Sequence, residues 1–338
     1  MPPLVLPYIG SFQDERCLIR SEDPLDEVWN HIGRFGTSYL EKHFKPDKMD
    51  IAWDEYLKYT QIRTRQALEF RRAARDASLL TAPLPLYYSF LNLTRALLAL
   101  GPEIMPKSGH GLRFMPGADL LSSKAQLAKG TFTDYLDTQG VAWNEGTQIS
   151  LSEALGFIVE LAYDYRSFDK NRVYVQPILV RAIMHGPVRL QFLNSPTDLG
   201  KDWKEDFPEL ADVCVEEDGC SLLVSDENLG KDSGVIAEFL GKRLLPDLTL
   251  LNHPTWYALR KKNDVIRLTR AGYYYVAMFI LGSAVRYEPE LILPASTADS
   301  EIGWLMRRFL RIAERYFPQL KLMEFYRSQI YFSGTSGM

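Results

Sequence analysis

Cysteine is scarce in this 338-residue chain, which contains only Cys17, Cys214 and Cys220. No Cys-x-x-Cys spacing occurs, and this argues against a structural zinc site. Cys214 and Cys220 could face each other across a hairpin. We favour two buried, reduced thiols, as expected in a reducing compartment.

A strong charge bias and a long apolar run are also missing. The net charge is −4, so any contact with nucleic acid would need a local basic patch. The longest apolar run, from Ala271 to Val285, is interrupted by tyrosines, glycines and a serine and is too short for a membrane span. The first residues are broken by prolines and lack a basic leader, unlike a signal peptide. We therefore expect a cytoplasmic protein without membrane contact.

The common catalytic motifs are absent as well. Gly230-Lys231 and Gly241-Lys242 lack the other residues of a phosphate loop, and no Gly-x-Gly-x-x-Gly follows a predicted strand. Neither His-Glu-x-x-His nor Gly-x-Ser-x-Gly occurs. The sequence predicts no cofactor and no metal.

The chain is organised around the stretch from Pro83 to Leu112. Its first half predicts a buried helix, because it is apolar almost all round and stops at Gly101-Pro102. Ser89, Asn92 and Arg95 interrupt the apolar residues within one arc of this helix.

A short loop then leads to Gly109-His110-Gly111, where the glycines let the backbone bring the imidazole close to a neighbour. With Arg95 or Asn92 nearby, His110 could act as a general acid or base, or bind phosphate as imidazolium. The alternative is a structural network in which His110 bonds a helix end and Arg95 pairs with a buried acid. His185 and His253 are expected to be loop histidines.

The N-terminal third predicts further helices. Asp23-Pro24 has the pattern of a helix start, and a longer helix is expected from about Ile51 to Leu80. The latter carries Arg63, Arg65, Arg71, Arg72 and Arg75, which suggest a phosphate-binding face. Pairs such as Arg65–Glu69 and Arg72–Asp76, four residues apart, favour a solvated, salt-bridged face instead.

The middle third predicts strands. We expect one hairpin turning at Lys129-Gly130, two strands between Val173 and Leu193 that place Pro177 at an edge or bulge, and a hairpin from Val213 to Val224. Ser150 and Glu153 have capping-box spacing for a helix that continues to about Tyr165.

Helices return in the last third, where Pro318 is expected to end the final one. Leu305, Phe309, Ile312 and Tyr316 form its apolar stripe. A different face carries four residues that could bind a phosphate-rich ligand or stack on bases: Trp304, Arg308, Arg311 and Arg315. The alternative is a solvated face on which Trp304 shields a neighbouring lobe.

Together these patterns predict an α+β, mainly α protein in which two helical regions pack together and a smaller antiparallel β region is inserted between them. The expected regions are helical 1–119, β-containing 120–225 and helical 226–338, or one composite domain.

Two sets of residues suggest a family. YYSFLNLTRALLAL followed by GHGL, and the later segment with Arg286, Tyr287 and Pro289, resemble the YaaC-like proteins. That resemblance covers most of the chain, implies a helix-rich fold with a β insertion and supplies no catalytic residues. The Tyr-Tyr helix is also distantly similar to the helical bundles of the HEPN group, many of which are metal-independent RNases. Their Arg and His lie four to six residues apart, unlike Arg95 and His110.

We therefore expect a prokaryotic, non-catalytic binding or assembly protein with a regulatory or defence-type role, acting through a protein partner or self-association. The alternative is a metal-independent RNase that uses Arg95 and His110, with RNA as the partner.

Overall fold

The structure is a computed structural model of the chain. It describes residues 4–6, 10–12, 16–43, 53–100, 105–106, 109–182, 187–193, 202–225, 239–241, 243–248, 255–262, 265–297, 299–326 and 328–333. Residues His185 and His253, and the Gly101-Pro102 stop, lie outside these ranges.

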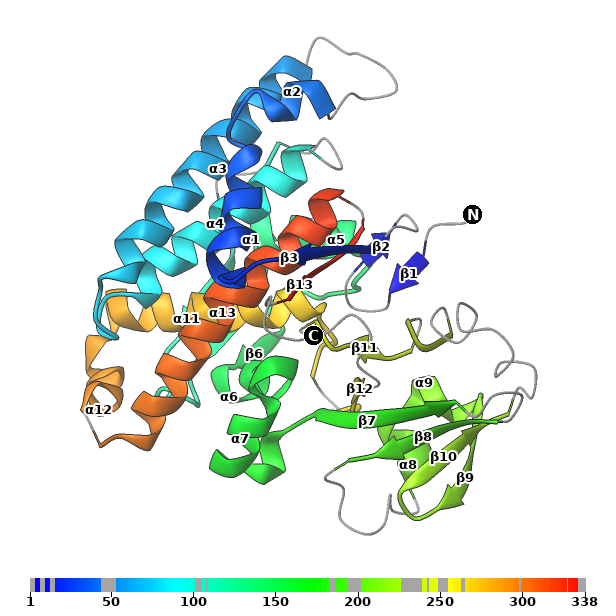
Figure 1. Ribbon diagram of the computed structural model, residues 1–338. Helices are drawn as coiled ribbons and strands as arrows, with labels where there is room; N and C mark the ends of the chain where they lie inside the picture. The colour runs from blue at the N-terminus through cyan, green and yellow to red at the C-terminus, as the bar shows by residue number, and fades with distance from the viewer. Residues whose placement is uncertain are drawn as a thin grey trace.

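Long helices form the larger part of the molecule (Figure 1). They are α1 (Pro24–Arg34), α3 (Trp53–Arg75), α4 (Pro83–Leu100), α11 (Arg270–Tyr287) and α13 (Glu301–Tyr326). Helix α4 contacts α3, α11 and α13, so it lies at the centre of this assembly. The α+β, mainly α fold with packed helical regions is confirmed.

Helix α4 is buried along nearly its whole length, as predicted from its apolar character. Phe90 stacks on Phe317 of α13 with ring centroids 3.9 Å apart. Its buried Ser89 is satisfied by the neighbouring helix, since Ser89 Oγ donates to the carbonyl oxygen of Ala67 on α3 at 2.8 Å. This helix is therefore the structural centre of the fold.

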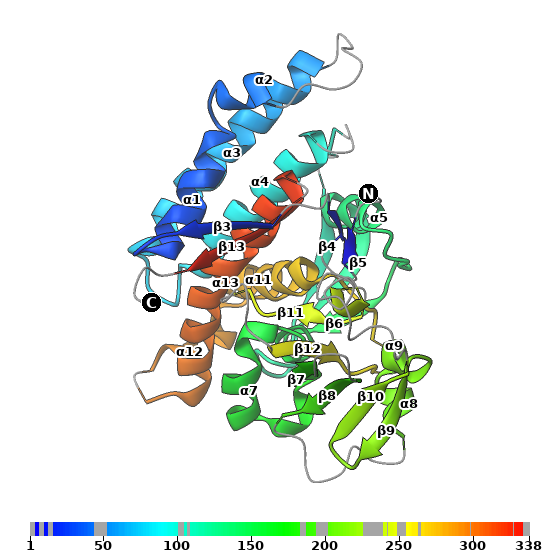
Figure 2. The same ribbon diagram turned by 45° about the vertical axis from the view of Figure 1, so that its right-hand side comes forward.

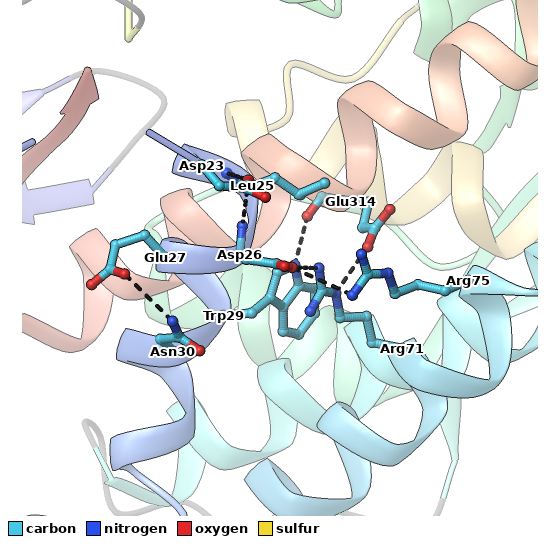
Figure 3. Close-up of polar contacts among 9 residues, drawn as sticks. All are labelled: Asp23, Leu25, Asp26, Glu27, Trp29, Asn30, Arg71, Arg75 and Glu314. Atoms are coloured by element: carbon cyan, nitrogen blue, oxygen red, sulfur yellow. Dashed lines mark hydrogen bonds and ion pairs between the residues drawn. The ribbon is translucent and has the colours of Figure 1, made fainter. Parts of the chain in front are cut away.

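Helix α1 begins as its sequence predicts. Asp23 accepts hydrogen bonds from the backbone N–H groups of Leu25 and Asp26 at 3.1 Å, and Pro24 occupies the first helical position (Figure 3). Helix α2 (Tyr39–His43) follows and packs on α3.

The prediction that Pro318 ends the last helix is wrong, because α13 continues through it to Tyr326. Proline has no N–H, so the carbonyl oxygen of Glu314, four residues earlier, loses its helical donor. The indole Nε1 of Trp29 on α1 donates to that oxygen at 3.0 Å (Figure 3). A donor from another helix thus replaces the missing backbone bond.

Trp29→Phe is expected to lower the free energy of unfolding by about 1–2 kcal/mol, because it leaves this carbonyl unsatisfied. Pro318→Ala restores an N–H at position 318, so the same Trp29 change should cost clearly less in that background. Urea unfolding of the four members of this double-mutant cycle measures the coupling. Equal costs in both backgrounds would contradict the compensation.

A six-stranded sheet forms the second part of the molecule, beside the helices (Figures 1 and 2). Its strand order is β11-β12-β7-β8-β10-β9, with every neighbouring pair antiparallel. The strands are β7 (Val175–Ala182), β8 (Val188–Phe192), β9 (Cys214–Asp218), β10 (Ser221–Val224), β11 (Leu245–Pro246) and β12 (Thr255–Leu259).

The predicted strands of residues 173–193 and the hairpin of residues 213–224 are confirmed by this sheet. Cys214 is buried on β9 and Cys220 lies at the turn, and both are free thiols. Since the sheet also includes β11 and β12, it extends past residue 225. The division into three regions stays a prediction.

Pro177 does not mark an edge strand, because β7 is an inner strand between β12 and β8. Its carbonyl oxygen still accepts from the N–H of Leu193 at 2.9 Å. The donor that proline lacks is supplied next to it, where the Gln176 side-chain amide donates to the carbonyl oxygen of Leu193. A side chain thus completes the pairing at the point where β8 ends.

The hairpin predicted at Lys129-Gly130 is wrong. A three-stranded sheet, in the order β4-β5-β6, contains β4 (His110–Met115), β5 (Lys124–Gly130) and β6 (Gln148–Ser150). After β5 the chain turns into α5 (Thr131–Thr138). Thr133 Oγ1 accepts from the N–H of Gly130 at 3.0 Å, and Phe132 stacks on Tyr275 of α11 at 4.9 Å. Packing and a local cap override the strand propensity of these residues.

The helix expected from Ser150 begins with the predicted capping box, in which Ser150 and Glu153 exchange hydrogen bonds. It then breaks into α6 (Leu151–Gly156), the 3-10 turn η1 (Val159–Leu161) and α7 (Ala162–Phe168). Further short elements are η2 (Lys170–Arg172), α8 (Trp203–Asp206), α9 (Pro208–Ala211), η4 (Pro289–Leu291) and α12 (Leu293–Ser296).

The remaining strands involve the two ends of the described chain. β3 (Arg16–Arg20) pairs in parallel with β13 (Gln329–Ser333), and β1 (Leu4–Leu6) pairs with β2 (Gly10–Phe12). Two apolar cores result: a large one among the helices and the three-stranded sheet, and a smaller one where Trp203, Phe207 and Leu210 pack against the six-stranded sheet.

Candidate functional site

A cavity with a volume of about 730 Å³ lies among the described residues. Its walls come from the start of α1, from η1 and α7, from β7 and β12, and from α11 and α13. It therefore lies where the helices meet the six-stranded sheet. Such a junction between two cores is a common place for a binding site.

Five arginines line this cavity: Arg166, Arg270, Arg308, Arg311 and Arg315. The three lining carboxylates are those of Asp23, Glu160 and Asp247, so positive charge is in excess. Tyr163, Tyr257 and Tyr316 add aromatic surface. Among the described residues, the cavity thus combines a positive field with tyrosine rings.

The sequence identified three of these arginines. Arg308, Arg311 and Arg315 are spaced three and four residues apart on α13 and share one face of it. Trp304 belongs to the same predicted group, but it does not line the cavity and its side chain is 48% exposed. The structure therefore brings the arginines together and leaves the tryptophan outside.

Arg311 and Arg315 face the cavity without an acidic partner among the described residues. Arg315 is half-buried and donates to the side-chain oxygen of Gln319 at 2.6 Å, and burial lowers its pKa. Arg308, by contrast, forms an ion pair with Asp164 at 2.7 Å. Two cationic groups are therefore available to a ligand.

Arg270 was missed by sequence reasoning, because it is the first residue of the apolar helix α11. It is 2% exposed, forms an ion pair with Glu160 and donates to the carbonyl oxygen of Pro246 at 2.9 Å. Burial opposes its charge, but Glu160 outweighs burial and raises the pKa of Arg270. The sequence signal that could have identified Arg270 is its position as a charged residue directly before an apolar run.

Tyr274 donates to the other carboxylate oxygen of Glu160 at 2.7 Å. The carboxylate of Glu160 is therefore held from two sides by residues of α11. This buried network forms a fixed floor to the cavity, whereas the arginines of α13 form its wall.

His110 lines a different cavity, of about 430 Å³, between α4, β4 and the C-terminal end of α11. Its half-buried ring is bonded through Nδ1 to the hydroxyl of Tyr87 at 2.8 Å. Burial, followed by the positive charges of Arg95 and Arg286, lowers the pKa of His110. Both effects favour the neutral form of the imidazole.

The glycines around His110 act on the backbone, not on the imidazole. Gly111 has φ +83°, and a Cβ at this position would lie 2.7 Å from the backbone nitrogen of Phe132. Only glycine allows β4 to pass this close to the start of α5. The predicted close approach exists, but it is between two stretches of main chain.

Asn92 and Arg95 do not join His110 on this cavity. Asn92 is buried, accepts from Arg63 at 3.2 Å and donates to the carbonyl oxygen of Tyr88 at 2.8 Å. Arg95 donates from Nε to Thr131 Oγ1 at 3.2 Å, and its positive charge lowers the pKa of His110. The three residues thus do not form one open site.

The described ranges contain no group of three or more His, Cys, Asp or Glu side chains placed to hold a metal ion. None of the helices in them has the length and apolar character needed to cross a membrane.

Fold and cavities define a mainly helical α+β protein with an arginine-lined cavity between its two cores. The family model described as "YaaC-like Protein" matches residues 34–325, so the chain belongs to the YaaC-like family. No curated protein matches the chain. No solved structure matches it either. The likeness to HEPN bundles has no support from these comparisons.

Proposed function

We propose that this YaaC-like protein is a non-catalytic binding protein that takes an anionic ligand in its arginine-lined cavity. The observation that supports this most directly is the pair Arg311 and Arg315, which face the cavity without an acidic partner among the described residues. Arg315 is half-buried, and a charge partly withdrawn from water is normally paired or bound to a ligand, whereas Arg311 is exposed and open to one. An incoming anion would supply that partner.

The chemistry of the walls favours a ligand with several acidic oxygens, such as a phosphate ester or a polycarboxylate. Guanidinium groups match the geometry of such oxygens and bind them through paired, charge-assisted hydrogen bonds. The cavity volume lies within the range of about 300–1,000 Å³ typical of small-molecule sites. Tyrosine hydroxyls can add hydrogen bonds to the same oxygens.

The other predicted roles have weaker support. Association with a protein partner or a second copy remains a proposal, motivated by the exposed Trp304 and by Tyr163, which is 81% exposed at the cavity. A metal-independent RNase would need Arg95 and His110 to act on one substrate. Arg95 is instead bonded to Thr131 and does not line the His110 cavity.

Isothermal titration of the purified protein with pyrophosphate and with citrate tests the anion proposal. We expect saturable binding of at least one of them, weakened about tenfold or more by Arg311→Gln, because one charge-assisted hydrogen bond contributes about 1.5–3 kcal/mol. Arg315→Gln should weaken it as well, with thermal melting used to confirm that each variant is folded.

Arg307→Gln is the matched control, because Arg307 is exposed on the same helix and does not line the cavity. It should bind like the wild type. Two results would overturn the proposal: no binding of either anion, or an equal loss in the Arg307 and Arg311 variants, which would indicate only a general effect of charge.

A further inference from the structure

The His110 cavity has aromatic walls contributed by three elements. Tyr87 and Tyr88 come from α4, Phe114 from β4, and Phe279 and Tyr287 from α11. Tyr87 packs edge-on against Phe279, with ring centroids 5.4 Å apart, and is buried at the floor. Tyr287 is 59% exposed at the opening. A ligand here would meet ring faces and edges on several sides, which suits a flat ring.

Polar groups are few in this cavity and lie at distinct places. His110 uses Nδ1 for Tyr87, so Nε2 is the ring nitrogen left for a ligand. Arg286 donates to the hydroxyl of Tyr88 at 3.0 Å, and Arg113 is exposed on β4. Neither arginine forms an ion pair with a described residue. Glu288 is the lining carboxylate, so the balance is again positive.

Gly282 of α11 keeps the floor of this cavity compact. A Cβ there would lie 3.1 Å from Cβ of Tyr87 and 3.3 Å from the carbonyl oxygen of Pro83. The absence of a side chain lets α4 and α11 pack closely and holds Tyr87 beneath the opening. The aromatic floor is therefore fixed by the backbones of two buried helices, as expected for a preformed site.

We propose that this cavity is a second binding site, for a flat heteroaromatic ring that carries an anionic group, the class to which nucleoside monophosphates belong. The ring would lie among Tyr88, Phe114 and Tyr287, with one edge hydrogen-bonded to Nε2 of His110. The anionic group would remain at the opening beside Arg286 and Arg113. Stacking on an aromatic side chain is open to any base, because every base has a π-face.

This site is independent of the arginine-lined cavity, because the two share no lining residue. Failure of the anion proposal therefore leaves this one standing, and the reverse also holds.

Titration calorimetry with AMP, GMP, CMP and UMP is the test. We expect at least one nucleotide to bind more tightly than its own nucleoside and than inorganic phosphate. Arg286→Gln should weaken that nucleotide about tenfold, since Arg286 is exposed and its loss leaves the fold intact. Tyr88→Leu should weaken it through lost stacking, and Arg307→Gln, at an exposed residue that lines neither cavity, should leave it unchanged.

Histidine NMR supplies a second readout. The charged and titratable groups around the imidazole are Tyr87, Tyr88, Arg95, Arg113, Arg286 and Glu288. Because positive charge contributes to the lowered pKa of His110, a bound anion should raise that pKa, and the nucleotide should bind more tightly as the pH falls through it. No such shift is expected in Arg286→Gln.

Three results would overturn the proposal. The first is that none of the four nucleotides binds. The second is that inorganic phosphate binds as tightly as the nucleotide, which would mean that the ring is not recognised. The third is binding that neither Arg286→Gln nor Tyr88→Leu changes.

Discussion

Arg71→Met should lower the free energy of unfolding by about 3 kcal/mol, because it removes the cation that joins three helices. Arg71 of α3 is 7% exposed and forms ion pairs with Asp26 of α1 at 2.6 Å and with Glu314 of α13 at 2.8 Å (Figure 3). Its guanidinium also lies 5.0 Å from the ring of Trp29. Methionine fills much of the space but leaves both carboxylates without this partner.

The neighbouring Arg72→Met is the matched control. Arg72 is 69% exposed and pairs with Glu69 three residues earlier, an arrangement that contributes about 0.5 kcal/mol or less. Urea unfolding of both variants measures the difference. Equal losses of stability would contradict the claim that Arg71 links the helices.

The contact between Arg71 and Asp26 also makes the stability of the protein depend on pH. The hydrogen bond from Arg71 lowers the pKa of Asp26 from its usual value of 3.8. A carboxylate with a lowered pKa in the folded state stabilises the protein above the unfolded pKa, and this contribution is lost as the pH falls through the folded value. The acid-induced loss of stability should therefore be smaller in Arg71→Met than in the wild type.

Gly156→Ala should destabilise the protein by about 3 kcal/mol, at the upper end of the usual effect of overpacking. A Cβ at this position would lie 2.1 Å from the carbonyl oxygen of Arg172 and 2.9 Å from the ring of Tyr174. The first atom belongs to the main chain and cannot rotate away. The two segments would have to separate, which weakens the hydrogen bond from the N–H of Tyr174 to the carbonyl oxygen of Gly156 at 2.9 Å.

Gly33→Ala is a control that should stabilise the protein instead of destabilising it. Its Cβ would lie 3.7 Å from Leu68, an ordinary van der Waals contact, and alanine favours a helix over glycine by up to about 1 kcal/mol. Thermal and urea unfolding should show a small gain for this variant and a large loss for Gly156→Ala. A loss in both would indicate that helix packing, and not contact with the main chain, decides the outcome.

Patterns of short range were predicted correctly from the sequence. The caps at Asp23 and Ser150, the buried helix α4 and the hairpin of β9 and β10 each depend on residues a few positions apart. Their hydrogen bonds form within the segment itself, so distant contacts did not change the outcome.

The errors occurred where a partner far along the chain supplied what the local sequence lacks. Trp29 allows Pro318 to lie inside a helix, and Phe132 packs on Tyr275 although its neighbours favour a strand. Arg71 was assigned to a solvated face, but carboxylates from two other helices hold it in the interior. A single sequence carries no direct signal for such contacts.

In the candidate sites, too, residues on one helix were grouped correctly, whereas residues on different elements were not. The spacing of Arg308, Arg311 and Arg315 predicted a shared face, because all three lie on one helix. The predicted grouping of His110 with Asn92 and Arg95 depended on the path of a loop and was not reproduced on one cavity. Arg286 and Tyr287 line the same cavity as His110 because α11 packs on both α4 and β4.

Helix α11 extends from one cavity to the other. Arg270, its first residue, lines one cavity, and Arg286 and Tyr287, its last residues, line the other, about 27 Å away for 18 residues. A displacement of α11 on binding at one end would reach the other end. Any coupling between the two ligands would then act through this helix, and by thermodynamic linkage it would be equal in both directions.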